Sequence, residues 1–129
     1  VYALQLTEDG FVTAGSSDSD DWFINAFGND GQSQWSISLT SGDTLRGLAQ
    51  DRSGFLYAAG SGNSAADGMV VLISPEGEIQ DTTLYDNGVA EVFRGVVVSP
   101  DGMVTTAGQR SAVGGNRFLI VDFNTGKAY

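Results

Sequence analysis

The stretch Asp67-Gly-Met-Val-Val-Leu-Ile-Ser-Pro-Glu-Gly77 is an apolar run of strand length that ends in a Pro-Glu-Gly turn. The same eleven-residue frame occurs without gaps at residues 21–31 and 116–126. A second frame, a shorter strand-like run that also ends in glycine, precedes each copy at residues 2–10, 46–54 and 94–102. Because two frames recur in the same order, the sequence indicates a three-fold internal repeat.

The spacing of this repeat predicts the architecture. Gly15, Gly60 and Gly108 occupy the same frame position and are 45 and 48 residues apart. Repeats of about 40–50 residues are typical of propeller blades or helical arrays, and the apolar segments here are too short for helices. Each repeat holds four such segments, as a four-stranded blade does. We therefore predict an all-β fold, a β-propeller segment of three four-stranded antiparallel blades at residues 1–40, 41–88 and 89–129.

The apolar segments and the glycine-containing turns predict about twelve strands. The expected strands are 2–7, 11–15, 22–27 and 33–39 in the first unit, 45–50, 55–60, 69–73 and 79–85 in the second, and 93–99, 103–108, 118–123 and a last strand from Lys127 in the third. The chain ends at Tyr129, so we expect the third blade to be cut short or completed by another chain.

Side-chain size predicts how the blades pack. The first strand of each unit is expected to be innermost, because Gly47 and Gly95 lie near its start and only small side chains fit where blades converge. Bulky side chains are expected between neighbouring blades. In the eleven-residue frame the residues at the same position are Phe23, Met69 and Phe118, and we expect all three to be buried. Three residues further along the frame, Ala26, Leu72 and Val121 are expected to pack in the same way.

Composition excludes several classes of function. Of the 129 residues 16 are acidic and 6 basic, giving a net charge of −10. This charge repels a phosphate backbone and no polybasic segment is present, so we expect neither nucleic acid nor a membrane surface as partner. No apolar run approaches the roughly 20 residues of a membrane-spanning helix. Without histidine and cysteine, imidazole bases, thiol nucleophiles and Cys/His zinc sites are excluded.

The setting of the chain is predicted from its beginning and its turns. The sequence begins at Val1 without an initiator methionine, so we expect that a leader was removed or that this is a piece of a longer protein. The low lysine content and the turns rich in Gly, Asn, Asp and Ser favour an extracellular, periplasmic or cell-surface protein.

Several short motifs recur at matching places in the three units. They are Asp9-Gly10, Ala14-Gly15, Asp21, Gly31 and Trp35-Ser36, then Gly54, Ala59-Gly60, Asp67 and Gly77, then Asp101-Gly102, Ala107-Gly108, Asn116 and Gly126. Their order resembles the repeat of bacterial secreted β-propellers, which carry tandem Trp-Ser and Asp-Gly motifs. The resemblance covers nearly the whole chain and departs at Asp81, where the first unit has tryptophan. It implies the fold and leaves the ligand open, because such scaffolds bind widely different ligands.

One acidic loop is a candidate metal site. The loops after the second and fourth strands of each unit are expected to share one face, where propellers usually build ligand sites. On this face Asp18, Asp20 and Asp21 form the densest acidic cluster, and carboxylate oxygens suit Ca²⁺, which takes 6 to 8 of them. The alternative is a solvated loop in which Asp21 forms an Asx turn, since the spacing matches no EF-hand.

Two arginines are the other candidate site. Arg46 and Arg94 share one frame position near the start of the innermost strand. In an acidic protein they form a local positive site suited to a carboxylate or a sulfate. The alternative is that each pairs with an acid on the preceding connection, Asp43 and Glu91 respectively.

Three classes of function remain. The first is an extracellular binding or structural propeller module that presents loops to a glycan, a peptide or a protein. The second is a carboxylate-based polysaccharide hydrolase or lyase, although nothing in the sequence marks any pair of carboxylates as positioned for it. The third is a repeat unit of a surface layer or appendage. We favour the first and name no catalytic residue and no cofactor beyond the calcium candidate.

The number of blades predicts a partner. Closed propellers need 4 to 8 blades, so three blades leave two faces open, with apolar stripes around Phe23 on one and Phe118 on the other. We expect these faces to be covered. Two copies give a six-bladed ring with two-fold symmetry, and the alternative is the remainder of a longer chain.

Overall fold

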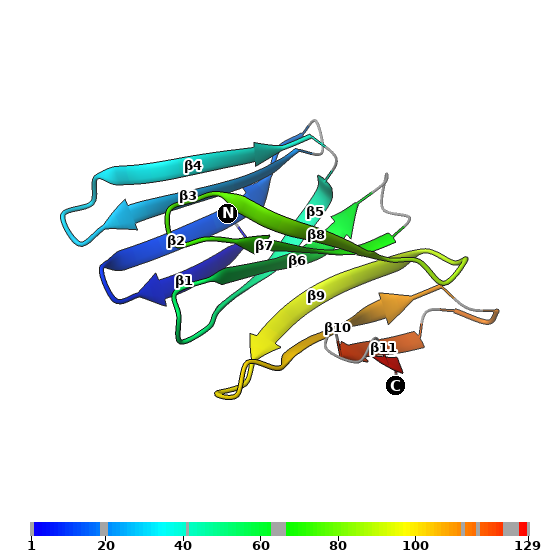
Figure 1. The fold of residues 1–129 in the computed structure, drawn as a ribbon. Coiled ribbons are helices and arrows are strands. Elements are labelled where there is room, and N and C mark those ends of the chain that lie inside the picture. The colour runs from blue at the N-terminus through cyan, green and yellow to red at the C-terminus, as the bar shows by residue number, and fades with distance from the viewer. Residues whose placement is uncertain are drawn as a thin grey trace.

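The structure is a computed structural model, and it describes residues 2–18, 21–40, 42–62, 67–111, 113–115, 117–122 and 127–128. These residues form three antiparallel sheets, each with four strands in sequence order (Figure 1). Within the same ranges no helix is long and apolar enough to cross a membrane. The predicted all-β, antiparallel fold is therefore confirmed.

The strands follow the predicted segments closely. Sheet 1 contains β1 (Ala3–Thr7), β2 (Gly10–Ser16), β3 (Trp22–Gly28) and β4 (Ser33–Leu39). Sheet 2 contains β5 (Gly42–Gln50), β6 (Leu56–Gly62), β7 (Asp67–Ile73) and β8 (Ile79–Tyr85). Sheet 3 contains β9 (Glu91–Val98), β10 (Val104–Arg110), β11 (Arg117–Asp122) and the two-residue β12 (Lys127–Ala128). The predicted end of the eleventh strand at Phe123 lies outside the described residues.

Three turns share one construction, and it explains their sequences. The first residue of each turn, Asp51, Ser74 or Ser99, accepts a hydrogen bond through its side chain from the backbone N–H four residues later, at 3.0–3.1 Å. The fourth residue is a glycine with φ of +88°, which side chains rarely allow. This pairing of an Asx- or Ser-type turn with glycine reverses the chain between neighbouring strands.

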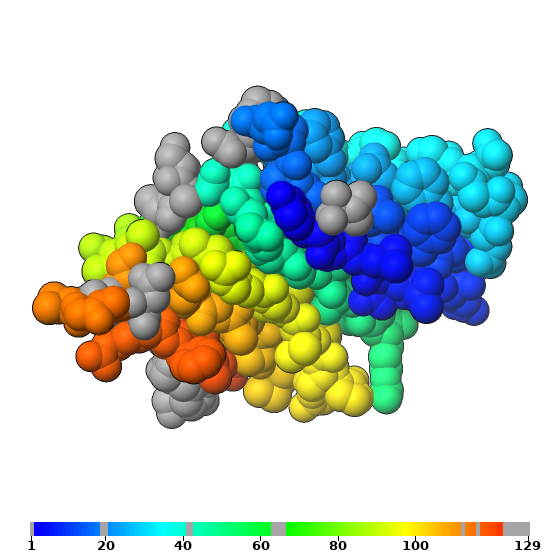
Figure 2. Space-filling model, turned by 180° about the vertical axis from the view of Figure 1, so that it is seen from behind, coloured from blue at the N-terminus to red at the C-terminus, as the bar shows by residue number. Residues whose placement is uncertain are grey.

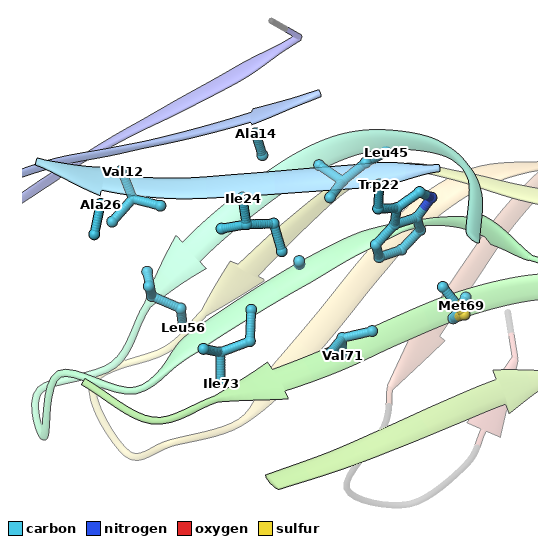
Figure 3. Close-up of a cluster of buried hydrophobic side chains, with 11 residues drawn as sticks. Val12, Ala14, Trp22, Ile24, Ala26, Leu45, Leu56, Met69, Val71 and Ile73 are labelled. Atoms are coloured by element: carbon cyan, nitrogen blue, oxygen red, sulfur yellow. The ribbon is translucent and has the colours of Figure 1, made fainter. Parts of the chain in front are cut away.

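Sheets 1 and 2 pack face to face around a first hydrophobic core. Figure 3 shows side chains of β2 and β3 pointing toward side chains of β5, β6 and β7. The buried members are Val12, Ala14, Trp22, Ile24, Ala26, Leu45, Leu56, Ala58, Met69, Val71 and Ile73. Strict alternation along β3 places every second residue in this core, as expected for a strand with one buried face.

Sheets 2 and 3 pack around a second hydrophobic core. Its buried members are Ala49, Ala59, Val70, Phe93, Val96, Val104, Leu119 and Val121. Residues of β7 contribute to both cores, Met69 and Val71 to the first and Val70 to the second. Sheet 2 therefore contributes buried side chains from both of its faces, although β8 is exposed, while sheets 1 and 3 each contribute from one.

The first strand of every sheet lies beside that of the next sheet. Figure 2 shows β1 in blue, β5 in teal and β9 in yellow side by side on one face of the molecule. The backbones approach closely at Gly47, where an added Cβ would lie 3.0 Å from the Cα of Gly95. Close approach is therefore found at Gly47, whereas an added Cβ on Gly95 would meet no atom within 4 Å.

The predicted equivalence of Phe23, Met69 and Phe118 is wrong. Strand register pairs Phe23 with Gly15, Met69 with Gly60 and Leu119 with Gly108, so Leu119 is the third equivalent. Met69 and Leu119 are buried, whereas Phe23 is 40% exposed and Phe118 is 91% exposed. The frame aligns the third strand of each sheet by the glycine of the turn that follows it. The register of that strand is instead set by its pairing with the second strand, which shifts Phe118 by one residue. Of the residues expected beyond them, Ala26 and Val121 are buried and Leu72 is half-buried.

Candidate functional site

The ends of the strands define two faces of the molecule. Because all strands alternate in direction, the connections from β4 to β5 and from β8 to β9 lie at one end of the sheets, which we call the upper face. The turns that join β1 to β2, β5 to β6 and β9 to β10 lie at the other end, the lower face. The candidate residues lie near the upper face, where β1, β5 and β9 begin.

Arg46 and Arg94 are the extra residues of two β-bulges. In β5, Leu45 pairs with Gly60 and Gly47 with Ala59, so Arg46 has no opposite residue. In β9, Phe93 pairs with Gly108 and Gly95 with Ala107, which leaves Arg94 unpaired in the same way. Such bulges redirect a side chain away from the regular alternation of a strand. The two arginines are thus structurally equivalent, as their frame position predicts.

The glycines opposite the bulges make them sterically possible. A Cβ on Gly60 would lie 1.9 Å from the carbonyl oxygen of Thr44, and a Cβ on Gly108 would lie 1.9 Å from that of Val92. No side chain fits at either place. The Ala-Gly pairs of the sequence therefore set the local backbone that presents the arginines.

Tyr2 occupies the corresponding position in sheet 1. It precedes Ala3, which pairs with Ala14, and its backbone N–H donates to the carbonyl oxygen of Ala14 at 2.8 Å. The guanidinium carbon of Arg46 lies 4.5 Å from the centre of the Tyr2 ring, a cation–π contact. Tyr2, Arg46 and Arg94 therefore occupy matching positions at the first strands of the three sheets.

The two arginines have different polar partners. The Nε atom of Arg46 is buried and has no hydrogen-bond partner among the described residues. The Nε and Nη2 atoms of Arg94 both donate to the side-chain oxygen of Gln109 over 3.4 Å, which is long for such bonds. The described residues thus leave Arg46 Nε without an acceptor and give Arg94 only two long hydrogen bonds.

Asp43 takes part in a network that holds the start of β5. Its Oδ2 accepts a hydrogen bond from the hydroxyl of Ser61 at 3.2 Å. The same hydroxyl accepts from the backbone N–H of Thr44, and the backbone N–H of Leu45 donates to Ser16 at 2.8 Å. Asp43 thus orders the chain just before the bulge, and Ser61 is the partner that the structure gives it.

Glu91 lies in an acidic group rather than beside Arg94. Its side chain is fully buried, and neither carboxylate oxygen has a hydrogen-bond partner among the described residues. Carboxylate oxygens of Asp67, Asp86 and Glu91 all lie within 4.8 Å of one another. Burial raises the pKa of Glu91, and the charges of Asp86 and Asp67 raise it further. The nearby backbone of Asn87 and the charge of Arg110 oppose this shift without cancelling it.

The predicted calcium cluster is only partly described. Asp20 lies outside the described residues, Asp18 is exposed and Asp21 is half-buried. The backbone of the loop closes on itself, because Ser17 N–H donates to the carbonyl oxygen of Asp21 at 2.9 Å and Asp21 N–H approaches the hydroxyl of Ser17 at 3.3 Å. The calcium hypothesis for these residues stays a prediction.

The predicted loop faces already place the three acids of this group at one end of the sheets. The connections carrying Asp86 and Glu91 were expected on the same face as the start of β7, where Asp67 lies. Neighbouring sheets were also expected to pack against each other. Asp67 shares the motif position of Asp21, for which the sequence suggests an Asx turn, and Glu91 is a predicted partner of Arg94, so neither prediction brings the three acids together.

A hollow on the lower face was not expected. It measures about 310 Å³, lies between sheets 1 and 2, and is lined among others by Glu8, Asp51, Arg52 and Trp35. Its volume is at the small end of the range for ligand sites. The Trp35 indole N–H donates to the carbonyl oxygen of Pro75 at 3.1 Å across the two sheets.

Comparisons with known proteins give the fold alone. No protein-family model and no curated protein matches the sequence. Among solved structures the chain is similar to a protein of unknown function from Bacteroides caccae, with 12% identity and a TM-score of 0.59. The similarity covers 98% of this chain and 58% of that one, so this chain spans less than two thirds of that structure.

Proposed function

We propose that this chain is a three-bladed segment of a β-propeller and that it acts as a binding module for a ligand with carboxylate or sulfate groups. Its ring is completed by a second copy or by further blades of a longer chain. The observation that carries the binding role is the matching position of Tyr2, Arg46 and Arg94 on adjacent inner strands.

The packing of the sheets supports the propeller. Each sheet has four antiparallel strands in sequence order, and its first strand lies beside the first strand of the next sheet. Face-to-face packing of such sheets around adjacent inner strands is how propeller blades are arranged.

The open face of sheet 3 supports a missing neighbour. On this face Phe118 lies opposite Gln109, and in sheet 1 Trp22 lies opposite Ser16. Phe118 and Trp22 therefore occupy corresponding positions in their sheets. Trp22 is fully buried by sheet 2, whereas Phe118 is 91% exposed. Ile120 and Val97 lie on the same open face and are also exposed. Positions that are buried between sheets 1 and 2 thus remain uncovered on sheet 3.

The open face of sheet 1 has the complementary character. Leu4, Leu6 and Phe23 point away from sheet 2 and are exposed, and the rings of Phe11 and Phe27 stack there at 5.0 Å. The residue of sheet 2 that corresponds to Phe23 is Met69, and Met69 is buried in the core between sheets 1 and 2. The open face of sheet 3 can therefore pack on the open face of sheet 1 of another copy, as sheet 1 packs on sheet 2 and sheet 2 on sheet 3. Two copies joined twice by this contact make a six-bladed ring.

The arginine geometry supports an anionic ligand. A guanidinium group offers planar, fork-shaped donors that match carboxylate and sulfate oxygens. The cation–π contact with Tyr2 restricts the Arg46 side chain, and an ordered donor loses less entropy on binding. The net charge of −10 opposes the approach of anions, so a ligand must be selected by these local contacts and not by the overall field.

An array of neutral, carboxylated and sulfated oligosaccharides tests the binding role. We expect acidic members alone to bind, and the double variant Arg46→Gln/Arg94→Gln to bind them at least tenfold more weakly, because each charged hydrogen bond contributes about 1.5–3 kcal/mol. Arg52→Gln is the control for a general charge effect, since it removes one positive charge, half of what the double variant removes, from an exposed position on the lower face.

Three results would contradict this function. Equal binding by the double variant and the wild type would remove the arginines from the site. Equal loss with Arg52→Gln would show a non-specific charge effect. A fall in the viscosity of a polysaccharide solution on incubation with the protein would instead indicate an enzyme.

A further inference from the structure

We infer that Asp67, Asp86 and Glu91 bind a divalent cation, Ca²⁺, at the upper face between sheets 2 and 3. Asp67 is the first residue of β7, Glu91 is the first residue of β9, and Asp86 directly follows β8. Three segments from two sheets thus bring carboxylate oxygens to within 4.8 Å of one another. This site is separate from the arginines and from the loop at residues 17–21, and it does not depend on the proposed ligand.

The environment of the Glu91 carboxylate points to a bound cation. The side chain of Glu91 has no exposed surface, and both of its oxygens lack a hydrogen-bond partner in the described part of the chain. A buried polar group without a partner is costly, and a buried carboxylate beside two others is more so. A cation that accepts all three carboxylates as ligands removes this cost.

The geometry fits Ca²⁺ in particular. Ca²⁺ binds 6 to 8 oxygens at about 2.3–2.6 Å in flexible arrangements, so two ligand oxygens of one ion lie at most about 5 Å apart. Mg²⁺ requires a rigid octahedron at about 2.0–2.1 Å and keeps most of its waters. Carboxylates are hard ligands, and the chain has no histidine or cysteine that would favour a softer metal.

The surroundings of the group support the same assignment. One oxygen of Asp86 accepts a hydrogen bond from the backbone N–H of Gly88 at 2.8 Å, which orients this carboxylate in a short connection. Arg110 pairs with Glu91 across β9 and β10, and its charge offsets only part of the local negative charge. The net charge of −10 attracts cations from solution.

A cation at this place joins two sheets. Asp67 belongs to sheet 2, Asp86 lies in the connection that follows β8, and Glu91 belongs to sheet 3, so binding stabilises the packing of the two sheets together with the second hydrophobic core. A ligand that binds only the folded state raises the melting temperature in proportion to the logarithm of its concentration. Calcium removal is therefore expected to loosen sheet 3 first.

Calorimetric titration of the full chain with CaCl₂ and thermal unfolding in CaCl₂ or EDTA test this inference. We expect one bound Ca²⁺ per chain, a dissociation constant of roughly 10⁻⁵–10⁻³ M, and a rise in Tm of roughly 5–10 °C at saturating calcium. MgCl₂ at the same concentration is expected to give a much smaller rise. Glu91→Gln should weaken calcium binding at least tenfold.

Matched variants make the test decisive. Glu76→Gln removes one carboxylate from an exposed turn outside the group and should leave calcium binding unchanged. If Glu91→Gln does not fold, Asp86→Asn replaces it, because Asp86 is exposed and its loss leaves no hole. The inference is overturned if the wild type shows neither a heat of calcium binding nor a calcium-dependent shift in Tm. It is also overturned if Glu91→Gln or Asp86→Asn binds calcium as tightly as the wild type. An equal effect of Mg²⁺ overturns the choice of calcium.

Discussion

Single glycines position the arginines of the proposed ligand site. Gly60 and Gly108 lie opposite the bulges of β5 and β9, where any side chain would overlap a backbone carbonyl. The bulges in turn place Arg46 and Arg94 outside the regular alternation of their strands. The sequence predicted that the two arginines are equivalent, but only the register shows that each is an extra residue.

Replacement of Gly60 by alanine tests this dependence. The new Cβ would lie 1.9 Å from the Thr44 carbonyl oxygen, so the bulge must change shape. We expect the free energy of unfolding to fall by roughly 2–4 kcal/mol, as measured by urea unfolding. Gly95→Ala is the control, because an added Cβ there meets no atom within 4 Å, and it should change stability by less than about 1 kcal/mol. Equal losses in the two variants would contradict the role given to Gly60.

At the scale of strands, β4 and β8 differ at one corresponding position. Trp35 in β4 pairs with Ala26, and Asp81 in β8 pairs with Leu72, so the two residues are equivalent. Trp35 reaches the turn of sheet 2 through its bond to Pro75. Asp81 instead lines a hollow of about 230 Å³ between sheets 2 and 3, together with Tyr57, Leu72 and Val104.

Asp81→Trp is therefore expected to stabilise the chain. The indole would cover apolar side chains that now border the hollow, which contributes about 1–2 kcal/mol at roughly 25 cal/mol per Å². Urea unfolding measures the change. Asp81→Ala, which only removes the carboxylate, should have little effect. A loss of stability in Asp81→Trp would show that β8 does not pack as β4 does.

The strands and their order within each sheet were predictable from the sequence, whereas the register of β11 and the contacts between sheets were not. Apolar segments between glycine-containing turns gave the strands to within a few residues, because period and turn chemistry are local. The assignment of Phe118 failed because register is set by pairing with β10, and one residue of slip moves a side chain to the other face. Contacts between sheets, such as Asp67 with Glu91, depend on packing that no local pattern encodes.

At the scale of the whole molecule, the open faces of sheets 1 and 3 are the feature that requires an explanation. Large apolar side chains lie on both, including Leu6 at 72% and Phe118 at 91% exposure. Soluble monomers rarely expose contiguous apolar patches of this kind. In our proposal a second copy or further blades cover them.

The mass of the 129-residue chain in solution tests this account most directly. Light scattering is expected to give about 27 kDa, twice the 13.5 kDa of one chain. Phe118→Asp should shift the chain toward the monomer, because it places a charge in the proposed contact, whereas Val113→Asp, at a fully exposed loop position, should not. A stable, folded species of 13.5 kDa would contradict the completed ring and with it the propeller proposal.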